Sequence, residues 1–135
     1  MKNEASDGSD QNFNGGNEIN SKVKYKDHML VRPRVDLLMQ NSKEFYGEFS
    51  DIIDLEQILT ITIDFQDVSF VDSSGAGAII RIANAIRLKG KILYIVNLNK
   101  NLSSVFRLSG FHRLMKILSY EEYIDSFPEM TSVMK

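Results

Sequence analysis

Four consecutive residues, Asp72-Ser73-Ser74-Gly75, are the part of this sequence best suited to chemistry. They follow a short apolar run at 68–71 and precede a segment with helical periodicity. We therefore expect them in a loop at the carboxyl end of a strand, where functional residues of α/β proteins tend to lie. A side-chain oxygen from one of the three polar residues can accept hydrogen bonds from the free N–H groups of the helix, which leaves a second hydroxyl for another role.

Two compatible interpretations of this turn follow. In the first, it is a helix cap and nothing more. In the second, an exposed serine accepts a phosphate, which adds about −1.5 to −2 charge beside Asp72 and is partly stabilised at a helix N-terminus. Gly75 and Gly77 have no side chain and Ala76 has a small one, so another surface could approach closely here. A phosphate would then change what docks, without unfolding the domain.

Strand and helix patterns alternate on both sides of the turn. Strand-like runs lie at 23–31, 59–65, 91–96 and 114–118, and helical periodicity follows near 41, 75, 99 and 119. This alternation predicts an α/β domain with a largely parallel sheet flanked by helices. The apolar helical faces expected in the core are Phe45, Phe49, Ile52 and Ile53; Ile79, Ile82, Ala83 and Ile86; and Leu102, Val105 and Phe106.

Helix-boundary residues support this division. Asn41 and Ser119 each open a capping-box pattern. Asn99 or Asn101 can cap the helix that is expected after the strand at 91–96. Gly90 and Gly110 suit helix C-termini because glycine adopts the left-handed conformation without strain. The run at 91–96 is nearly continuously apolar, as expected for a strand buried on both faces.

Length and composition limit the function classes. The 135 residues suit one domain, the formal net charge is −2, and there is no cysteine. No apolar run approaches the ~20 residues of a membrane span, and the polar start lacks a signal-peptide core. We therefore expect a cytoplasmic, monomeric protein with no nucleic-acid or membrane partner. Residues 1–20 carry one Lys against four Asp and Glu, so we interpret 1–21 as a disordered acidic tail, or a tether, and 22–135 as the domain.

Enzyme signatures are weak. No Gly-x-Ser-x-Gly elbow is present, and the glycines after Asp72 lack dinucleotide or P-loop spacing. His28 and His112 have no acidic cluster in sequence around them and are expected at the surface or a strand edge. Asp64 and Asp67 flank a turn and are expected to be solvated. The sequence therefore predicts neither catalysis nor a metal or other cofactor.

Residues 64–77, DFQDVSFVDSSGAG, resemble the signature of STAS domains, specifically bacterial anti-sigma factor antagonists. The resemblance extends through KGKILYIVNL at 89–98 and VFRLSGF at 105–111, and upstream to VRPRVD at 31–36. Altogether it covers about residues 23–127. It implies a small mixed, largely parallel sheet flanked by helices. Ala76, Pro33 and Lys100 depart from the residues usual in that family, and Pro33 and Ala76 lie near the presumed docking face.

The resemblance also implies a mechanism. Such antagonists bind an anti-sigma factor that is a serine kinase and thereby release a sigma factor; phosphorylation by the kinase inactivates them, and a phosphatase restores them. Carried onto this chain, the phosphoacceptor is Ser73, and Ser74 caps the helix. The expected partner-binding residues are Asp36, Asp72, Ser74, Gly75, Ala76 and Gly77. The alternative is a STAS subunit of a lipid-transport ATPase or of a stress-sensing scaffold.

Overall fold

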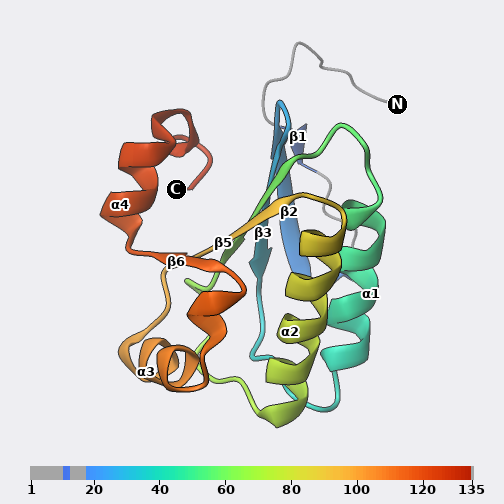
Figure 1. Ribbon diagram of the computed structural model, residues 1–135, viewed down its shortest axis with the longest axis vertical. Helices are drawn as coiled ribbons and strands as arrows, with labels where there is room; N and C mark the ends of the chain where they lie inside the picture. The colour runs from blue at the N-terminus through green and yellow to red at the C-terminus, as the bar shows by residue number, and fades with distance from the viewer. Residues whose placement is uncertain (1–10, 13–17, 135) are drawn as a thin grey trace.

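Six strands and four helices alternate in the computed structural model, which describes residues 11–12 and 18–134 (Figure 1). The strands are β1 (Gln11–Asn12), β2 (Asn20–Tyr25), β3 (His28–Pro33), β4 (Thr60–Asp64), β5 (Ile92–Val96) and β6 (Lys116–Leu118). The helices are α1 (Ser42–Ile53), α2 (Ser73–Leu88), α3 (Lys100–Leu108) and α4 (Tyr120–Ser126), with short 3-10 turns η1 (Phe111–Arg113) and η2 (Pro128–Met130). No helix in this part of the chain is long and apolar enough to cross a membrane.

The strands form one sheet in sequence order, β1-β2-β3-β4-β5-β6. The first two pairings are antiparallel and the other three are parallel, so the predicted mixed, largely parallel sheet is confirmed. Ile63 in β4 lies opposite Val31 in β3 and Ile95 in β5. This register brings the carboxyl ends of β3, β4 and β5 together at one edge, which is the edge where α2 begins (Figure 1).

Helices α1 and α2 cover one face of the sheet, and α3 contributes to the same core (Figure 1). Apart from Val105, every apolar helical residue expected in the core is buried. Phe106 of α3 packs edge-on against Phe65, with ring centroids 5.7 Å apart. Val105 is 49 % exposed, so its predicted core position is wrong, and Ile92 at the start of β5 is also largely exposed.

Helix α4 and η2 close the opposite face, where Leu30, Val96 and Tyr123 form a second apolar cluster. His28 lies inside this cluster and not at the surface or a strand edge, so that expectation is wrong. Its Nε2 is 2.7 Å from the Thr62 hydroxyl oxygen and 2.9 Å from the Tyr123 hydroxyl oxygen. A histidine can be buried here because both neighbours satisfy its ring nitrogen.

Most helix caps in the structure are the ones expected from the sequence. The Asn99 side chain accepts from the Leu102 N–H, Ser119 and Glu122 form the expected capping box, and Gly90 and Gly110 have positive φ. Asn41 is the exception: its side chain makes no cap bond. It instead accepts from the Leu38 N–H and donates to the Asp36 carbonyl, bracing the loop that leads into α1.

The expected acidic tail, 1–21, lies mostly outside the described residues. Within them, β2 begins at Asn20, and the Glu48 carboxylate of α1 accepts from the backbone N–H groups of Ile19 and Asn20. Ile19 packs against the main core. The ordered fold therefore includes residues before 22.

The environment of His28 predicts a specific pH dependence. Burial lowers the pKa of His28 from 6.5 to about 4. Between these values the unfolded chain binds a proton that the native state excludes, so stability falls as pH drops through this window. From pH 7 to pH 5 we expect a loss of about 2 kcal/mol in the free energy of unfolding, measured by urea denaturation.

His28→Gln is expected to flatten this part of the pH profile, whatever it does to stability at pH 7. His112→Gln, at an exposed position, is the matched control and should retain the full dependence. Equal pH dependence in the wild type and His28→Gln would contradict the assignment.

Candidate functional site

The site rests on a buried carboxylate at the carboxyl end of β4. Asp64 has no solvent exposure, so its expected solvated position is wrong, whereas Asp67 is exposed as predicted. One Asp64 oxygen accepts from Arg32 of β3, at 2.7 and 2.9 Å. The other accepts from the Asn97 side chain at 2.9 Å and the Gln66 N–H at 3.0 Å. Asp64 thus ties the end of β3 to the segments that follow β4 and β5.

The loops that follow β3 and β4 pair with each other. Leu37, after β3, makes an isolated parallel bridge with Val71, after β4. The Leu37 carbonyl accepts from the Asp72 N–H at 3.1 Å. Asp36 reinforces the pairing, since one carboxylate oxygen accepts from the N–H groups of Ser69 and Phe70 at 2.8 and 3.2 Å. Asp36 therefore lies at the same edge as Asp72, and its hydrogen bonds hold the loop in place.

Asp72 caps α2 and also accepts a hydrogen bond from the loop that follows β3. One of its oxygens accepts from the Gly75 N–H and the other from the Met39 N–H, both at 2.9 Å. Hydrogen bonds from the N–H groups of Gly75, Met39 and Ser74 lower the pKa of Asp72, so it stays ionised near neutral pH. The expectation that Ser74 caps the helix is wrong, because the Asp72 carboxylate occupies that role.

Ser73 is the first residue of α2, and its side chain is exposed. Ser74 and Ala76 are half-buried, and Gly77 is exposed. The capping carboxylate of Asp72 makes Ser73 dispensable for helix initiation. Its hydroxyl is therefore available to a reagent or enzyme approaching from solvent.

Gly75 is required by a close approach. A Cβ on Gly75 would lie far inside van der Waals distance of the Leu37 carbonyl oxygen and 2.8 Å from the carbonyl carbon. A Cβ on Gly77 would meet nothing within 4 Å. The two glycines expected to serve docking therefore differ: Gly75 holds the loop against α2, and Gly77 leaves the surface flat.

Three exposed apolar side chains border the turn and were not singled out from the sequence. Phe70 is 57 % exposed, Met39 is 72 % exposed, and Val35 is 39 % exposed. Phe70 lies two residues before Asp72, and Met39 donates its N–H to that carboxylate. The available signal was alternation in the run at 68–71, in which Val68 is buried and Phe70 is not.

The described part of this turn offers an exposed hydroxyl, that of Ser73, next to the Asp72 carboxylate. Within residues 11–12 and 18–134, no group of three or more His, Cys, Asp and Glu side chains could hold a metal ion. The buried His28 belongs to the other end of β3 and β4 and cannot serve Ser73 as a base.

Comparison with known proteins identifies the family. The sequence profile described as the STAS domain matches residues 20–123. This chain belongs to the STAS domain family. The family expectation drawn from residues 64–77 is therefore confirmed.

Solved structures show the same fold. TM1081 of Thermotoga maritima is 24 % identical, with 74 % of this chain and 86 % of that chain covered and a TM-score of 0.66. The Bacillus cell fate determinant SpoIIAA, in its phosphorylated form, is 21 % identical over 87 % of this chain and 98 % of that chain, with a TM-score of 0.58. The murine anion transporter Slc26a9 is 18 % identical over 70 % of this chain but only 16 % of its own, with a TM-score of 0.62. At these identities the likeness establishes the fold.

The two glycines of the turn give a matched test of the close approach. Gly75→Ala should lower the free energy of unfolding by about 2 kcal/mol or more, because the added methyl overlaps the Leu37 carbonyl. Gly77→Ala should raise it by about 0.5–1 kcal/mol, because the site is open and alanine favours the helix. Urea denaturation of both variants measures the difference, and similar values for the two would contradict the geometry.

Proposed function

We propose that this STAS protein is a phosphorylation-regulated anti-sigma factor antagonist, and that Ser73 is its phosphoacceptor. The observation that carries the proposal is the exposed Ser73 hydroxyl at the start of α2, released from capping by Asp72. The likeness to SpoIIAA, which has been solved unphosphorylated and phosphorylated, supports it. The chain acts as a substrate and ligand of its partners and not as an enzyme, and it needs no cofactor.

A phosphate on Ser73 would lie near backbone N–H groups, at the start of α2, that already donate hydrogen bonds to Asp72. The Asp72 carboxylate already accepts from the Gly75 N–H, and the Asp72 carbonyl accepts from the Ala76 N–H. The new dianion would therefore lie beside an ionised carboxylate and point to solvent, with the helix dipole offsetting part of the repulsion. The domain would stay folded while its surface gained about −1.5 to −2 charge.

The apolar border of the turn explains how that charge would act. Phe70, Met39 and Val35 offer a partner exposed hydrophobic area around Ser73. A partner that buries this area must also desolvate Ser73, which costs little for a hydroxyl that finds a hydrogen bond and far more for a phosphate. Docking would then be favourable before phosphorylation and unfavourable after it.

The proposed partners are an anti-sigma serine kinase and a serine phosphatase. The docking face comprises Asp36, Asp72, Ser74, Gly75, Ala76 and Gly77 together with the apolar border. Release of the sigma factor follows from occupation of the kinase, so the protein itself contacts neither nucleic acid nor membrane. We propose a monomer that acts in the cytoplasm. The lipid-transport ATPase subunit and the stress-sensing scaffold share the fold but require no kinase.

Phosphate mapping tests the assignment of Ser73. Incubation with the cognate kinase and ATP should label the wild type at a single site, located by mass spectrometry. Ser73→Ala should lose labelling but still bind the kinase, and Ser73→Asp should bind at least about tenfold more weakly because it places a charge in the contact.

Ser74→Ala is the matched control and should be labelled at Ser73. Labelling of Ser73→Ala would refute the phosphoacceptor. Co-purification with a transport ATPase, in the absence of a kinase, would instead favour the accessory-subunit alternative.

A second test addresses the apolar border. Phe70→Ala removes an exposed ring, so the free energy of unfolding should change by less than about 0.5 kcal/mol, while kinase affinity should fall by about tenfold or more. Leu88→Ala, at a still more exposed position at the far end of α2, should bind like the wild type. Titration by calorimetry measures both affinities, and equal losses for the two variants would exclude a contact centred on Phe70.

A further inference from the structure

Charge is segregated along this fold. Residues 73–120 hold eight Lys and Arg and no Asp or Glu, whereas the other residues hold all 18 acidic side chains. This basic stretch forms α2, β5, α3, η1 and β6, so it occupies one contiguous half of the sheet with its helices. The formal net charge of −2 conceals this strongly basic half.

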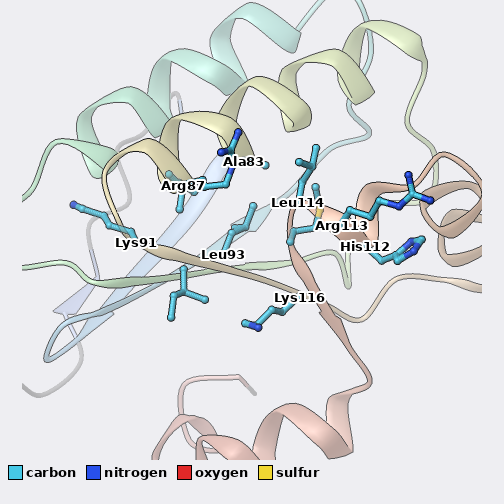
Figure 2. A pocket seen from close by; sticks show the side chains of 11 residues that line it. Ala83, Arg87, Lys91, Leu93, His112, Arg113, Leu114 and Lys116 are labelled. Carbon is cyan, nitrogen blue, oxygen red and sulfur yellow. The ribbon is translucent and has the colours of Figure 1, made fainter.

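A groove opens within the basic half, between α2 and the segment that leads into β6. Ile86, Leu93 and Met115 contribute apolar lining, and Arg87, Arg113 and Lys116 contribute cations; we call this the basic groove. Figure 2 shows Arg87 on the α2 side, Leu93 of β5 in the middle, and Leu114 and Arg113 across from them. The cavity volume is about 240 Å³, and no acidic residue lines it.

Not every cation near the groove is available. The Lys91 ammonium donates to the carbonyls of Ile53 and Leu55, and Lys89 lies 3.4 Å from Asp54. Arg87 makes one hydrogen bond, to the Asn84 side chain, which leaves most of its donors unused.

Arg113 and Lys116 are exposed and form no ion pair with any residue in the described part of the chain. Three cations can therefore accept an anionic partner without breaking an internal salt bridge.

An exposed apolar side chain also borders the groove. Ile92, at the start of β5, lines it and is 43 % exposed. Cations around an apolar hollow favour carboxylates joined to hydrophobic side chains. Single-stranded nucleic acid would call for large aromatic side chains on which bases stack, and the groove lining holds the imidazole of His112 but no Phe, Tyr or Trp. A bilayer surface would favour a protruding apolar face over a recess.

We propose that the basic groove binds an acidic segment of a partner protein. Carboxylates of the segment pair with Arg87, Arg113 and Lys116, and an apolar side chain enters the hollow over Ile86, Leu93 and Met115. The groove lies at the C-terminal end of α2, about 22 Å along the helix from Ser73. It is therefore a second interaction surface, which stays accessible whether or not the serine end of α2 is engaged.

The test uses the full chain and a fluorescein-labelled peptide of repeated Glu with two Leu residues, measured by fluorescence anisotropy. Arg113→Glu combined with Lys116→Glu should weaken binding by about tenfold or more, because attraction becomes repulsion. Lys26→Glu combined with Lys43→Glu, at two exposed sites outside the groove, gives the same total change of charge; this double variant is the matched control and should bind like the wild type. Raising NaCl from about 0.1 M to about 1 M, which shortens the Debye length from about 10 Å to about 3 Å, should also weaken binding.

Three results would overturn the proposal. The first is that the wild type fails to bind the Glu peptide. The second is that the Arg113→Glu/Lys116→Glu variant binds as tightly as the wild type while its thermal unfolding is unchanged. The third is that single-stranded DNA or phosphatidylglycerol vesicles bind more tightly than the peptide. A peptide with Gln in place of Glu should bind at least about tenfold more weakly, and equal affinity for it would likewise exclude an acidic ligand. Ser73→Asp should leave the affinity unchanged, so the outcome here is independent of the kinase experiment.

Discussion

The buried Asp64 carboxylate organises this end of the molecule. It is fully removed from solvent, yet it accepts from Arg32, the Asn97 side chain and the Gln66 N–H, so its charge and lone pairs are satisfied. Removing one partner of such a buried pair costs about 3–5 kcal/mol, because the remaining charge is stranded. Arg32 also donates to the Met134 carbonyl, so the same network reaches the C-terminal segment. Asp64 therefore links the end of β3 to the segments after β4 and β5, and Arg32 links β3 to the C-terminal segment.

That arrangement explains why Ser73 lies at the N-terminus of α2 without capping it. Backbone pairing between Leu37 and Val71 and the clamp from Asp72 to Met39 fix the turn without help from Ser73. Helix N-termini usually engage the first hydroxyl available, since their N–H groups need acceptors. Here a carboxylate satisfies them, and Gly75 permits the close contact with Leu37. These hydrogen bonds hold the backbone of the turn, and the exposed Ser73 hydroxyl takes no part in them.

The sequence predicted what local interactions decide. The Asn99 and Ser119 caps, the glycine termini and the apolar faces of α1 and α2 depend on residues a few positions apart, and they are as expected. The predicted exposure of Asp64 and His28 was wrong because their partners, Arg32 and Tyr123, lie 32 and 95 positions away in the sequence. Partners at such distances give no local signal. The cap expected from Asn41 failed for a different reason: its partners, Leu38 and Asp36, are close in sequence, and the loop before α1 competes with the helix for its side chain.

The two ends of α2 carry opposite charge for reasons that are only partly helical. Asp72 at the start and Arg87 near the end complement the helix dipole, and that alone would account for both. Arg113 and Lys116 lie on other elements, in η1 and β6, where the dipole of α2 gives no reason for a cation. Their convergence with Arg87 on an apolar hollow without a carboxylate is therefore not explained by stability. The proposed binding of an acidic segment accounts for it, because such a partner would gain from the potential of all three cations at once.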